Sequence, residues 1–158
     1  MSVNEVIMAP LIFLLLTFGV LYAISRLVFK NLLTLSLIGR ISMAVMLIVT
    51  GVAHFTNADF MIEMMPEFVP MKREVVYFTG ICELLAVFGL IWNKTSKLTS
   101  VALMIFFIAI LPANIIGSLK SVPLGGMDYG ALYLLFRIPL QILFILWVYY
   151  FGIRVNKS

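Results

Sequence analysis

The sequence predicts an all-α membrane protein with five transmembrane helices, and three observations support this fold class. Of the 158 residues, 63% are hydrophobic and 11% are charged, whereas a soluble domain averages about half apolar and about a quarter charged residues. The mean hydropathy is +1.15. Five apolar runs approach the roughly 20 residues that a helix needs to cross a bilayer. A chain of this length fits one bundle of five spans and leaves no room for a separate soluble domain.

The five predicted spans follow one another with short connections. They cover residues 6–25, 38–54, 75–92, 99–118 and 130–151. The first run is preceded by Asn4 and Glu5 instead of a positively charged segment, and it is longer than the apolar core of a signal peptide. We therefore expect it to be retained, which divides the chain into an amino-terminal transmembrane helix at residues 1–30 and a four-helix membrane domain at residues 31–158.

The charged residues of the connecting segments separate into two sets. One set contains no acid and comprises Arg26, Lys30, Arg40, Lys94, Lys97, Arg154 and Lys157. The opposite set is mixed and comprises Lys72, Arg73, Lys120, Glu5, Asp59, Glu63, Glu67, Glu74 and Asp128. Because cytoplasmic loops carry the excess of Lys and Arg, we expect the amino terminus outside and the carboxyl terminus in the cytoplasm. The net charge of +4 then reflects contact with the lipid bilayer and predicts no nucleic-acid partner.

Two ionisable side chains interrupt the apolar runs. Glu83 lies within the third span and Arg137 within the fifth, and a charge inside the bilayer is costly unless it has a partner or a function. At about 1.5 Å per residue, Glu83 lies roughly 12 Å and Arg137 roughly 10 Å below the outer surface. We expect these two side chains to form a buried ion pair.

Further polar side chains share this depth. Asn114 and His54 lie near the outer ends of the fourth and second spans, and Gln141 lies one turn inward of Arg137. Glu83, Arg137, Asn114, His54 and Gln141 together form a predicted ligand-binding layer. Secondary candidates on the same helix faces are Thr79, Tyr133 and Ser118.

This polar layer has two interpretations. It lines a ligand-binding cavity, since ionisable groups within the membrane usually have a function, or it is a structural network that fixes helix packing. His54 likewise either exchanges protons at the mouth of the cavity, because histidine titrates near neutral pH, or anchors the end of its helix. Pro112 and Pro139 lie beside the layer and each frees one backbone carbonyl, which is tolerated where it is buried in protein or lines a wet cavity.

An outer segment at about 56–70, between the second and third spans, mixes apolar with acidic residues. Its apolar members are Phe60, Met61, Met64, Met65, Phe68 and Val69. The mixture is typical of a short helix lying on the outer leaflet, ended by Pro66 and Pro70. The other interpretations are a lid over the cavity and a docking surface for a periplasmic partner, because methionine-rich surfaces suit adaptable binding.

Several motifs resemble those of the DoxX-like family of small bacterial membrane proteins. They are Gly51-Val52-Ala53-His54-Phe55, Phe68-Val69-Pro70, the segment 77–85, Leu111-Pro112-Ala113-Asn114-Ile115 and Arg137-Ile138-Pro139-Leu140-Gln141. The resemblance covers roughly residues 35–151 and implies a DoxX-like four-helix bundle in the bacterial inner membrane, to which the first helix is an amino-terminal addition. The family includes the membrane subunit of a thiosulfate:quinone oxidoreductase, so the resemblance implies a quinone ligand and redox partner subunits.

The residue types present limit the chemistry that the chain can perform alone. The single cysteine, Cys82, excludes an intramolecular disulfide relay and a cysteine-ligated metal cluster, and a single histidine excludes a bis-histidine haem. No Gly-x-Gly-x-x-Gly fingerprint is present. We therefore predict no metal site. If the chain is an oxidoreductase subunit, a bound quinone and partner chains carry the electrons.

Two functions from different classes follow. The first is a membrane subunit that binds a quinone or a similar amphipathic molecule in an outward-facing polar pocket. The alternative is a non-catalytic assembly or interaction protein in which a buried network of Glu83 and Arg137 is structural. Transport is less favoured, because apart from Arg40 and Ser42 the inner half of the bundle offers almost no polar path.

Overall fold

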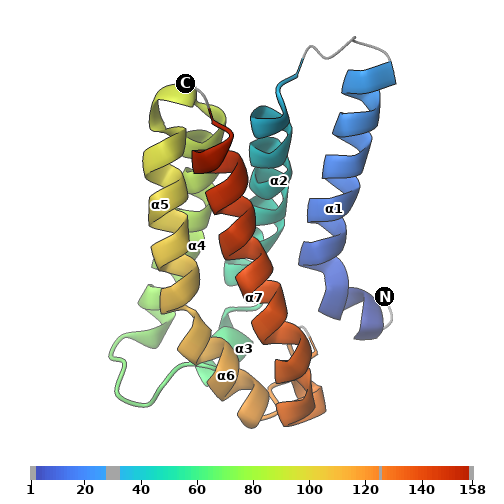
Figure 1. Cartoon of the computed structure of the whole chain (residues 1–158). Helices are drawn as coiled ribbons and strands as arrows, with labels where there is room; N and C mark the ends of the chain where they lie inside the picture. The colour runs from blue at the N-terminus through green and yellow to red at the C-terminus, as the bar shows by residue number, and fades with distance from the viewer. Residues whose placement is uncertain (1–2, 28–32, 125, 157–158) are drawn as a thin grey trace.

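The computed structural model describes residues 3–27, 33–124 and 126–156, and all regular secondary structure in these ranges is helical (Figure 1). Lys30 and Lys157, which belong to the basic set of the charge pattern, lie outside the described residues. The elements in chain order are α1 (Val3–Leu27), α2 (Leu35–Thr56), α3 (Ala58–Glu63), α4 (Lys72–Ile91), α5 (Asn93–Ala109), α6 (Leu111–Leu119), η1 (Met127–Tyr133), α7 (Leu134–Tyr149) and η2 (Tyr150–Arg154).

Five helical stretches are long and apolar enough to cross a membrane, which confirms the predicted number of spans. Three of them lie within α1, α2 and α4. The fourth joins α5 to α6 across a break at Ile110, and the fifth joins η1, α7 and η2. Pro112 stands at the first turn of α6, where a residue without a backbone N–H is tolerated, so this proline separates two helices within one span.

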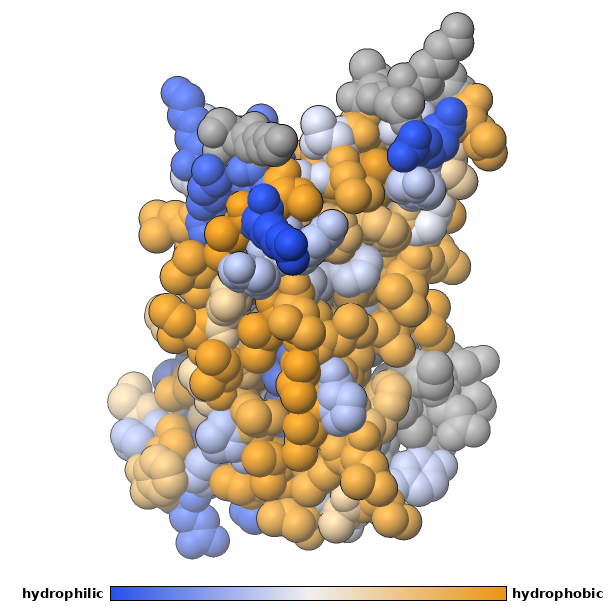
Figure 2. Space-filling view, viewed as in Figure 1, coloured by the Kyte–Doolittle hydropathy of each residue, from blue (hydrophilic) through white to orange (hydrophobic). Residues whose placement is uncertain are grey.

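The helices run up and down, with α2 between α1 and α4 and with α5 packed against α4 and α7 (Figure 1). One end of the bundle holds the carboxyl terminus and the α4–α5 turn, and the other, which we name the α3 end, holds α3, α6 and η1. A space-filling view shows a broad apolar middle with hydrophilic residues towards both ends (Figure 2). This distribution is what a bilayer-spanning bundle requires.

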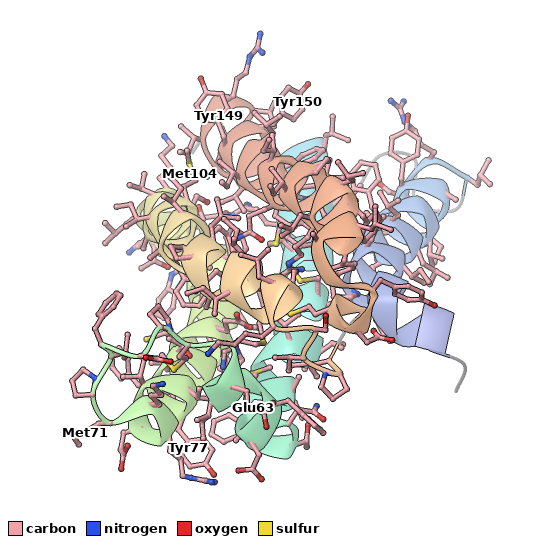
Figure 3. All side chains as sticks on the ribbon, turned by 90° about the horizontal axis from the view of Figure 1, so that it is seen from below. Glu63, Met71, Tyr77, Met104, Tyr149 and Tyr150 are labelled. Carbon is pink, nitrogen blue, oxygen red and sulfur yellow. The ribbon has the colours of Figure 1, made fainter. Side chains whose placement is uncertain are left out.

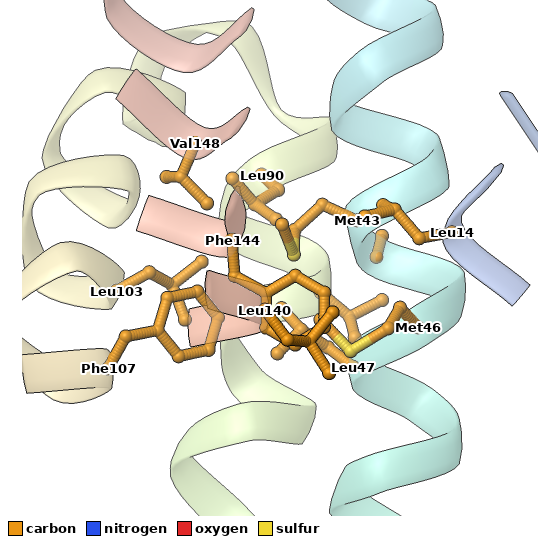
Figure 4. Close-up of a cluster of buried hydrophobic side chains, with 12 residues drawn as sticks. Leu14, Met43, Met46, Leu47, Leu90, Leu103, Phe107, Leu140, Phe144 and Val148 are labelled. Atoms are coloured by element: carbon orange, nitrogen blue, oxygen red, sulfur yellow. The ribbon is translucent and has the colours of Figure 1, made fainter. Parts of the chain in front are cut away.

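The apolar core lies halfway between the two ends. It contains Leu14 of α1, Met43 and Leu47 of α2, Leu90 of α4 and Phe144 of α7, all at most 3% exposed (Figure 4). In lipid, helix association depends on close packing and hydrogen bonds, because the tails are as apolar as the side chains. Leu14 shows that α1 joins this core, so the helix that the DoxX-like resemblance omits is packed into the same bundle.

Helices α2 and α4 pack closely against each other, and glycines permit this contact. A Cβ atom on Gly80 of α4 would lie 2.6 Å from the Cβ of His54 and 3.2 Å from the carbonyl oxygen of Gly51. Small residues at such crossings let two membrane helices approach each other closely. The consequence is that polar side chains of α2 and α4 reach one another directly.

A polar network closes the end of the bundle opposite to α3, although Nε of Arg40 has no hydrogen-bond partner among the described residues. Arg40 is 3% exposed and donates through Nη1 to the carbonyl of Leu90 at 3.0 Å and through Nη2 to Oδ1 of Asn93 at 2.7 Å. The carbonyls in the last turn of a helix have no partner within the helix and attract a cation. Nearby, the Asn156 amide donates to Ser96 Oγ at 2.8 Å. Arg40 therefore has a structural role at the end of α4.

At the α3 end, the predicted short helix in the segment 56–70 is present as α3, which ends before Pro66. Two surface contacts hold it: Arg73 donates to Asp59 at 2.6 Å, and Lys120 donates to the carbonyl of Glu63 at 3.4 Å. Seen from this end, α3 lies beside α2 and α4, with Glu63 and Tyr77 on the same side of the molecule (Figure 3). The segment therefore covers one end of the bundle.

Candidate functional site

A cavity of about 380 Å³ lies inside the bundle at the α3 end. Residues from every helix except η2 line it, together with residues from the connections between them. Its walls are mostly apolar; they include Ala9, Pro10, Met46, Val49, Ala53, Met61, Met64, Met65, Val75, Val76, Phe107, Ile110, Ala113, Leu124, Met127 and Phe144. The polar lining residues are Thr50, His54, Asn57, Thr79, Asn114, Tyr133, Arg137 and Gln141.

Three of the predicted site residues meet on one side of this cavity. Arg137 of α7 donates through Nη2 to Oδ1 of Asn114 at 3.1 Å. Gln141, one turn further along α7, donates through Nε2 to the carbonyl of Phe107 at 2.6 Å. Phe107 stands in the last turn of α5, just before the helix breaks at Ile110. The break thus turns Asn114 towards Arg137 and gives Gln141 a backbone acceptor.

Each of these three side chains keeps a buried polar atom that bonds to no other described group. The atoms are Nδ2 of Asn114, Nε of Arg137 and Oε1 of Gln141. Most buried polar side-chain atoms in native proteins have a hydrogen-bond partner, and a persistent exception needs an explanation. Two unused donors and one unused acceptor beside a cavity are the arrangement expected of a site that receives a polar group.

Glu83 does not pair with Arg137, and this expectation from the sequence is wrong. Its side chain is buried beside the cavity without lining it. Thr50 donates to Oε2 of Glu83 at 2.5 Å, and Oε1 lies 3.5 Å from Nε2 of His54. Neither ion pair of the described residues involves Arg137. The physical reason is helix order: α4 packs mainly against α2, whereas α7 packs mainly against α5, so Glu83 and Arg137 attract each other without contact.

His54 connects Glu83 with the cavity. It lines the cavity, and its Nδ1 lies 3.0 Å from the carbonyl oxygen of Val76 and 3.1 Å from Oγ1 of Thr79. The hydroxyl of Thr79 itself donates to the carbonyls of Val75 and Val76. His54 therefore spans α2 and α4 and has one ring edge on a backbone carbonyl and the other towards a carboxylate.

Of the three secondary candidates, two lie at the cavity. Thr79 and Tyr133 line it, and Tyr133 interacts with Arg137. Ser118 does not line it: its hydroxyl is fully buried and donates to the carbonyl of Asn114 at 2.9 Å, within α6. Within the described residues no group of three or more His, Cys, Asp or Glu side chains could hold a metal ion.

Two sets of site residues were missed by sequence reasoning. Thr50 is the direct partner of Glu83, and its spacing of four residues before His54 on α2 was the available signal. Ala9 and Pro10 bring α1 to the cavity, which no motif indicated. The methionines of the α3 segment turn inwards, since Met61, Met64 and Met65 all line the cavity, whereas Phe68 is 85% exposed.

Comparison with known proteins adds a family and no activity. A family model described as a domain of unknown function (DUF8561) matches residues 43–152. No curated protein and no solved structure matches the chain. The matched range begins within α2 and ends in η2, so it includes every predicted site residue and excludes α1.

Proposed function

The chain belongs to the DUF8561 family, whose function is unknown, and we propose that its α3-end cavity binds an amphipathic small molecule such as a quinone. One observation carries this proposal: a cavity with mainly apolar walls has three polar side chains with unused hydrogen-bonding atoms on one side. We propose further that the chain is a DoxX-like membrane subunit of the bacterial inner membrane, with the α3 end facing outwards.

The dimensions and chemistry of the cavity support a small-molecule ligand. Its volume of about 380 Å³ falls within the roughly 300–1,000 Å³ typical of ligand pockets, which are lined mainly by apolar side chains with a few polar groups. Phe107, Phe144 and the surrounding methionines give an adaptable apolar wall. An amphipathic molecule would place its apolar part against this wall and its oxygen atoms near Arg137.

The polar residues divide into two roles in this proposal. Arg137 and Asn114 bind and orient the oxygen of the ligand, because they hold the unused donors. His54 forms part of the cavity wall, and Glu83 positions His54 from behind. Glu83 thus acts through His54, in place of the role as partner of Arg137 that the sequence suggested.

Electron transfer would require other molecules. The chain has one cysteine and one histidine, so a redox reaction here would use the bound quinone and a partner chain that carries the electrons. The resemblance to DoxX-like proteins supports this arrangement, because a membrane subunit of a thiosulfate:quinone oxidoreductase belongs to that family. The proposal is therefore a ligand-binding subunit of a redox complex.

Filling the cavity tests the proposal directly. Ala113 lines the cavity, so Ala113→Phe should occupy the space of the ligand. Native mass spectrometry of the gently purified chain should detect one bound small molecule in the wild type and none in A113F. Ala102→Phe makes the same substitution at an exposed position of α5 and should keep the molecule. Retention of the molecule in A113F would place its binding site elsewhere.

A non-catalytic assembly or interaction protein is the second candidate, and a specific observation favours it. Glu83, Thr50 and His54 form a buried hydrogen-bonding cluster that joins α2 to α4, which is a structural role in itself. Beside it, Phe68 and Met71 expose 85% and 69% of their surface at the α3 end, as a docking surface would. For this candidate, native spectra of the wild type should contain no small molecule, and A113F should still co-purify with the partner chain.

A further inference from the structure

Arg137 is a cation without a carboxylate partner. It donates to the neutral amide of Asn114 and interacts with the phenol of Tyr133. No Asp or Glu is among the described residues that line the cavity. The carboxylate of Glu83, which attracts Arg137 without contact, accepts a hydrogen bond from Thr50 and faces His54. Neither ion pair of the described residues includes Arg137.

The contacts of Glu83 hold its carboxylate between α2 and α4. Thr50 of α2 donates to Oε2 of Glu83, and Oε1 lies 3.5 Å from Nε2 of His54. The Nδ1 atom of His54 lies 3.0 Å from the carbonyl oxygen of Val76 and 3.1 Å from Oγ1 of Thr79. The carboxylate of Glu83 is therefore engaged by side chains of α2, and Arg137 of α7 is not in contact with it.

Arg137 thus presents its guanidinium group to the cavity with no carboxylate in contact among the described residues. A buried charge is expensive unless it is paired and hydrogen-bonded. The guanidinium group presents its donors in a planar fork that matches the two oxygens of a carboxylate or phosphate. The unused Nε of Arg137 and the unused Nδ2 of Asn114 are both donors, as an anionic group requires. Gln141 contributes the one unused acceptor, which complements a hydroxyl or a water beside the anion.

We propose that the ligand of the cavity is an amphipathic oxyanion whose charged group binds between Arg137 and Asn114. This inference rests on the proposed ligand-binding function and narrows it, because a neutral ring carbonyl would leave the charge of Arg137 unpaired. The apolar part of the molecule lies against Phe107, Phe144 and the methionine side chains. A free carboxylic acid and the phosphate of an anionic lipid share this chemistry.

A pair of probes of equal shape tests the charge requirement. Equilibrium dialysis of the full chain in phosphatidylcholine nanodiscs, with empty nanodiscs subtracted, measures the affinity for 2-naphthoate and for its neutral analogue 2-naphthamide. The wild type should bind 2-naphthoate at least about tenfold more tightly, since hydrogen bonds to charged groups are stronger than neutral ones. Repeating the measurement with phosphatidylglycerol distinguishes the sources: weaker 2-naphthoate binding there identifies the lipid phosphate, and unchanged binding identifies a free acid.

Three variants assign the effect to residues. Arg137→Gln should remove the preference for 2-naphthoate while 2-naphthamide still binds, which also shows that the variant is folded. Arg154→Gln removes the same charge from an exposed position at the opposite end of the bundle and should keep the preference. Arg73→Gln removes a charge at the α3 end itself, where Arg73 pairs with Asp59 and does not line the cavity, and should change 2-naphthoate affinity by no more than about twofold.

Several results would overturn the inference, and they separate it from the proposed function. Equal wild-type affinities for the two probes would exclude the anion and leave a neutral ligand in the same cavity. A preference that survives R137Q would exclude Arg137 as its cause. Loss of the preference in R73Q would mean that surface charge at the α3 end, and not the cavity, attracts the anionic probe. If neither probe binds, the inference is excluded. If, in addition, native mass spectrometry detects no bound small molecule in the wild type, the proposed function is excluded as well.

Discussion

At the scale of the residue, Thr50 shows how a carboxylate is kept within an apolar bundle. Its hydroxyl donates to Glu83 at 2.5 Å and lies within 3.4 Å of the carbonyl oxygens of Met46 and Leu47. Glu83 is only 4% exposed, so this donor from the protein is important. His54 completes the surroundings of the carboxylate. Both side chains that contact the buried acid therefore come from the neighbouring helix α2.

Removing that hydroxyl should destabilise the bundle. Thr50→Val keeps the shape and leaves Glu83 with one donor fewer, so the free energy of unfolding should fall by about 1–2 kcal/mol, more than the roughly 0.6 kcal/mol average for hydrogen bonds between membrane helices. Thr56→Val on the same helix removes an exposed hydroxyl that lies 3.5 Å from the carbonyl of Val52 and accepts from the exposed Asn57 amide at 3.0 Å, and it should cost less than about 0.5 kcal/mol. Unfolding in mixed detergent micelles, followed by circular dichroism, measures both; equal effects would contradict the role of Thr50.

At the scale of the element, close packing and a helix break create the site. The contact of α2 with α4 depends on Gly80, and it brings His54 to Val76 and Thr79. The break between α5 and α6, where Pro112 stands in the first turn of α6, turns Asn114 towards Arg137. Gly80 and the helix break both act through the geometry of the backbone. The polar side chains would be separated if either span were a regular, well-spaced helix.

Gly80→Ala tests the close contact between α2 and α4. The added Cβ would lie 2.6 Å from the Cβ of His54, so α2 and α4 must move apart, and overpacking of this kind costs typically about 1–3 kcal/mol. The matched control is Gly19→Ala in α1, where nothing lies within 4 Å of the new atom and the higher helix propensity of Ala should leave stability unchanged or raised. The same micelle unfolding experiment compares them. A G80A variant as stable as G19A would show that α2 and α4 accommodate the added methyl group without loss of stability.

At the scale of the whole molecule, the two ends differ in charge and in construction. The end opposite to α3 holds Arg40 in a network of hydrogen bonds with Leu90 and Asn93, and its exposed connecting residues include basic side chains such as Lys97. The α3 end holds the cavity and both signs of charge, as in the pair of Arg73 and Asp59. By the positive-inside rule, we propose that the cavity faces away from the cytoplasm.

Cysteine labelling tests this orientation. In a Cys82→Ser background, a cysteine replacing Phe68, which is 85% exposed at the α3 end, should react with a membrane-impermeant maleimide in intact cells. A cysteine replacing Lys97, which is exposed at the other end, should react only after permeabilisation. The reverse pattern would invert the topology, and labelling of both in intact cells would contradict a single orientation.

Much of the site could be predicted because depth in a membrane follows from position in a span. His54, Asn114, Arg137 and Gln141 all line one cavity, as their shared depth suggested. The error concerned Glu83, because depth says nothing about which helices are neighbours. In a bundle of five spans, a carboxylate and a guanidinium at equal depth can lie on helices that other helices separate.

The sequence by itself determined the class of the molecule, the number of its spans and the level of its polar layer, because apolar length and charge placement are local properties of the chain. Only the tertiary structure decided which side chains contact one another. It joined Glu83 to Thr50 and His54, brought α1 and the α3 methionines to the cavity, and left Arg137 without a carboxylate. Helix order and the approach of α2 to α4 at Gly80 fix these contacts, and both arise from packing among segments distant in the chain.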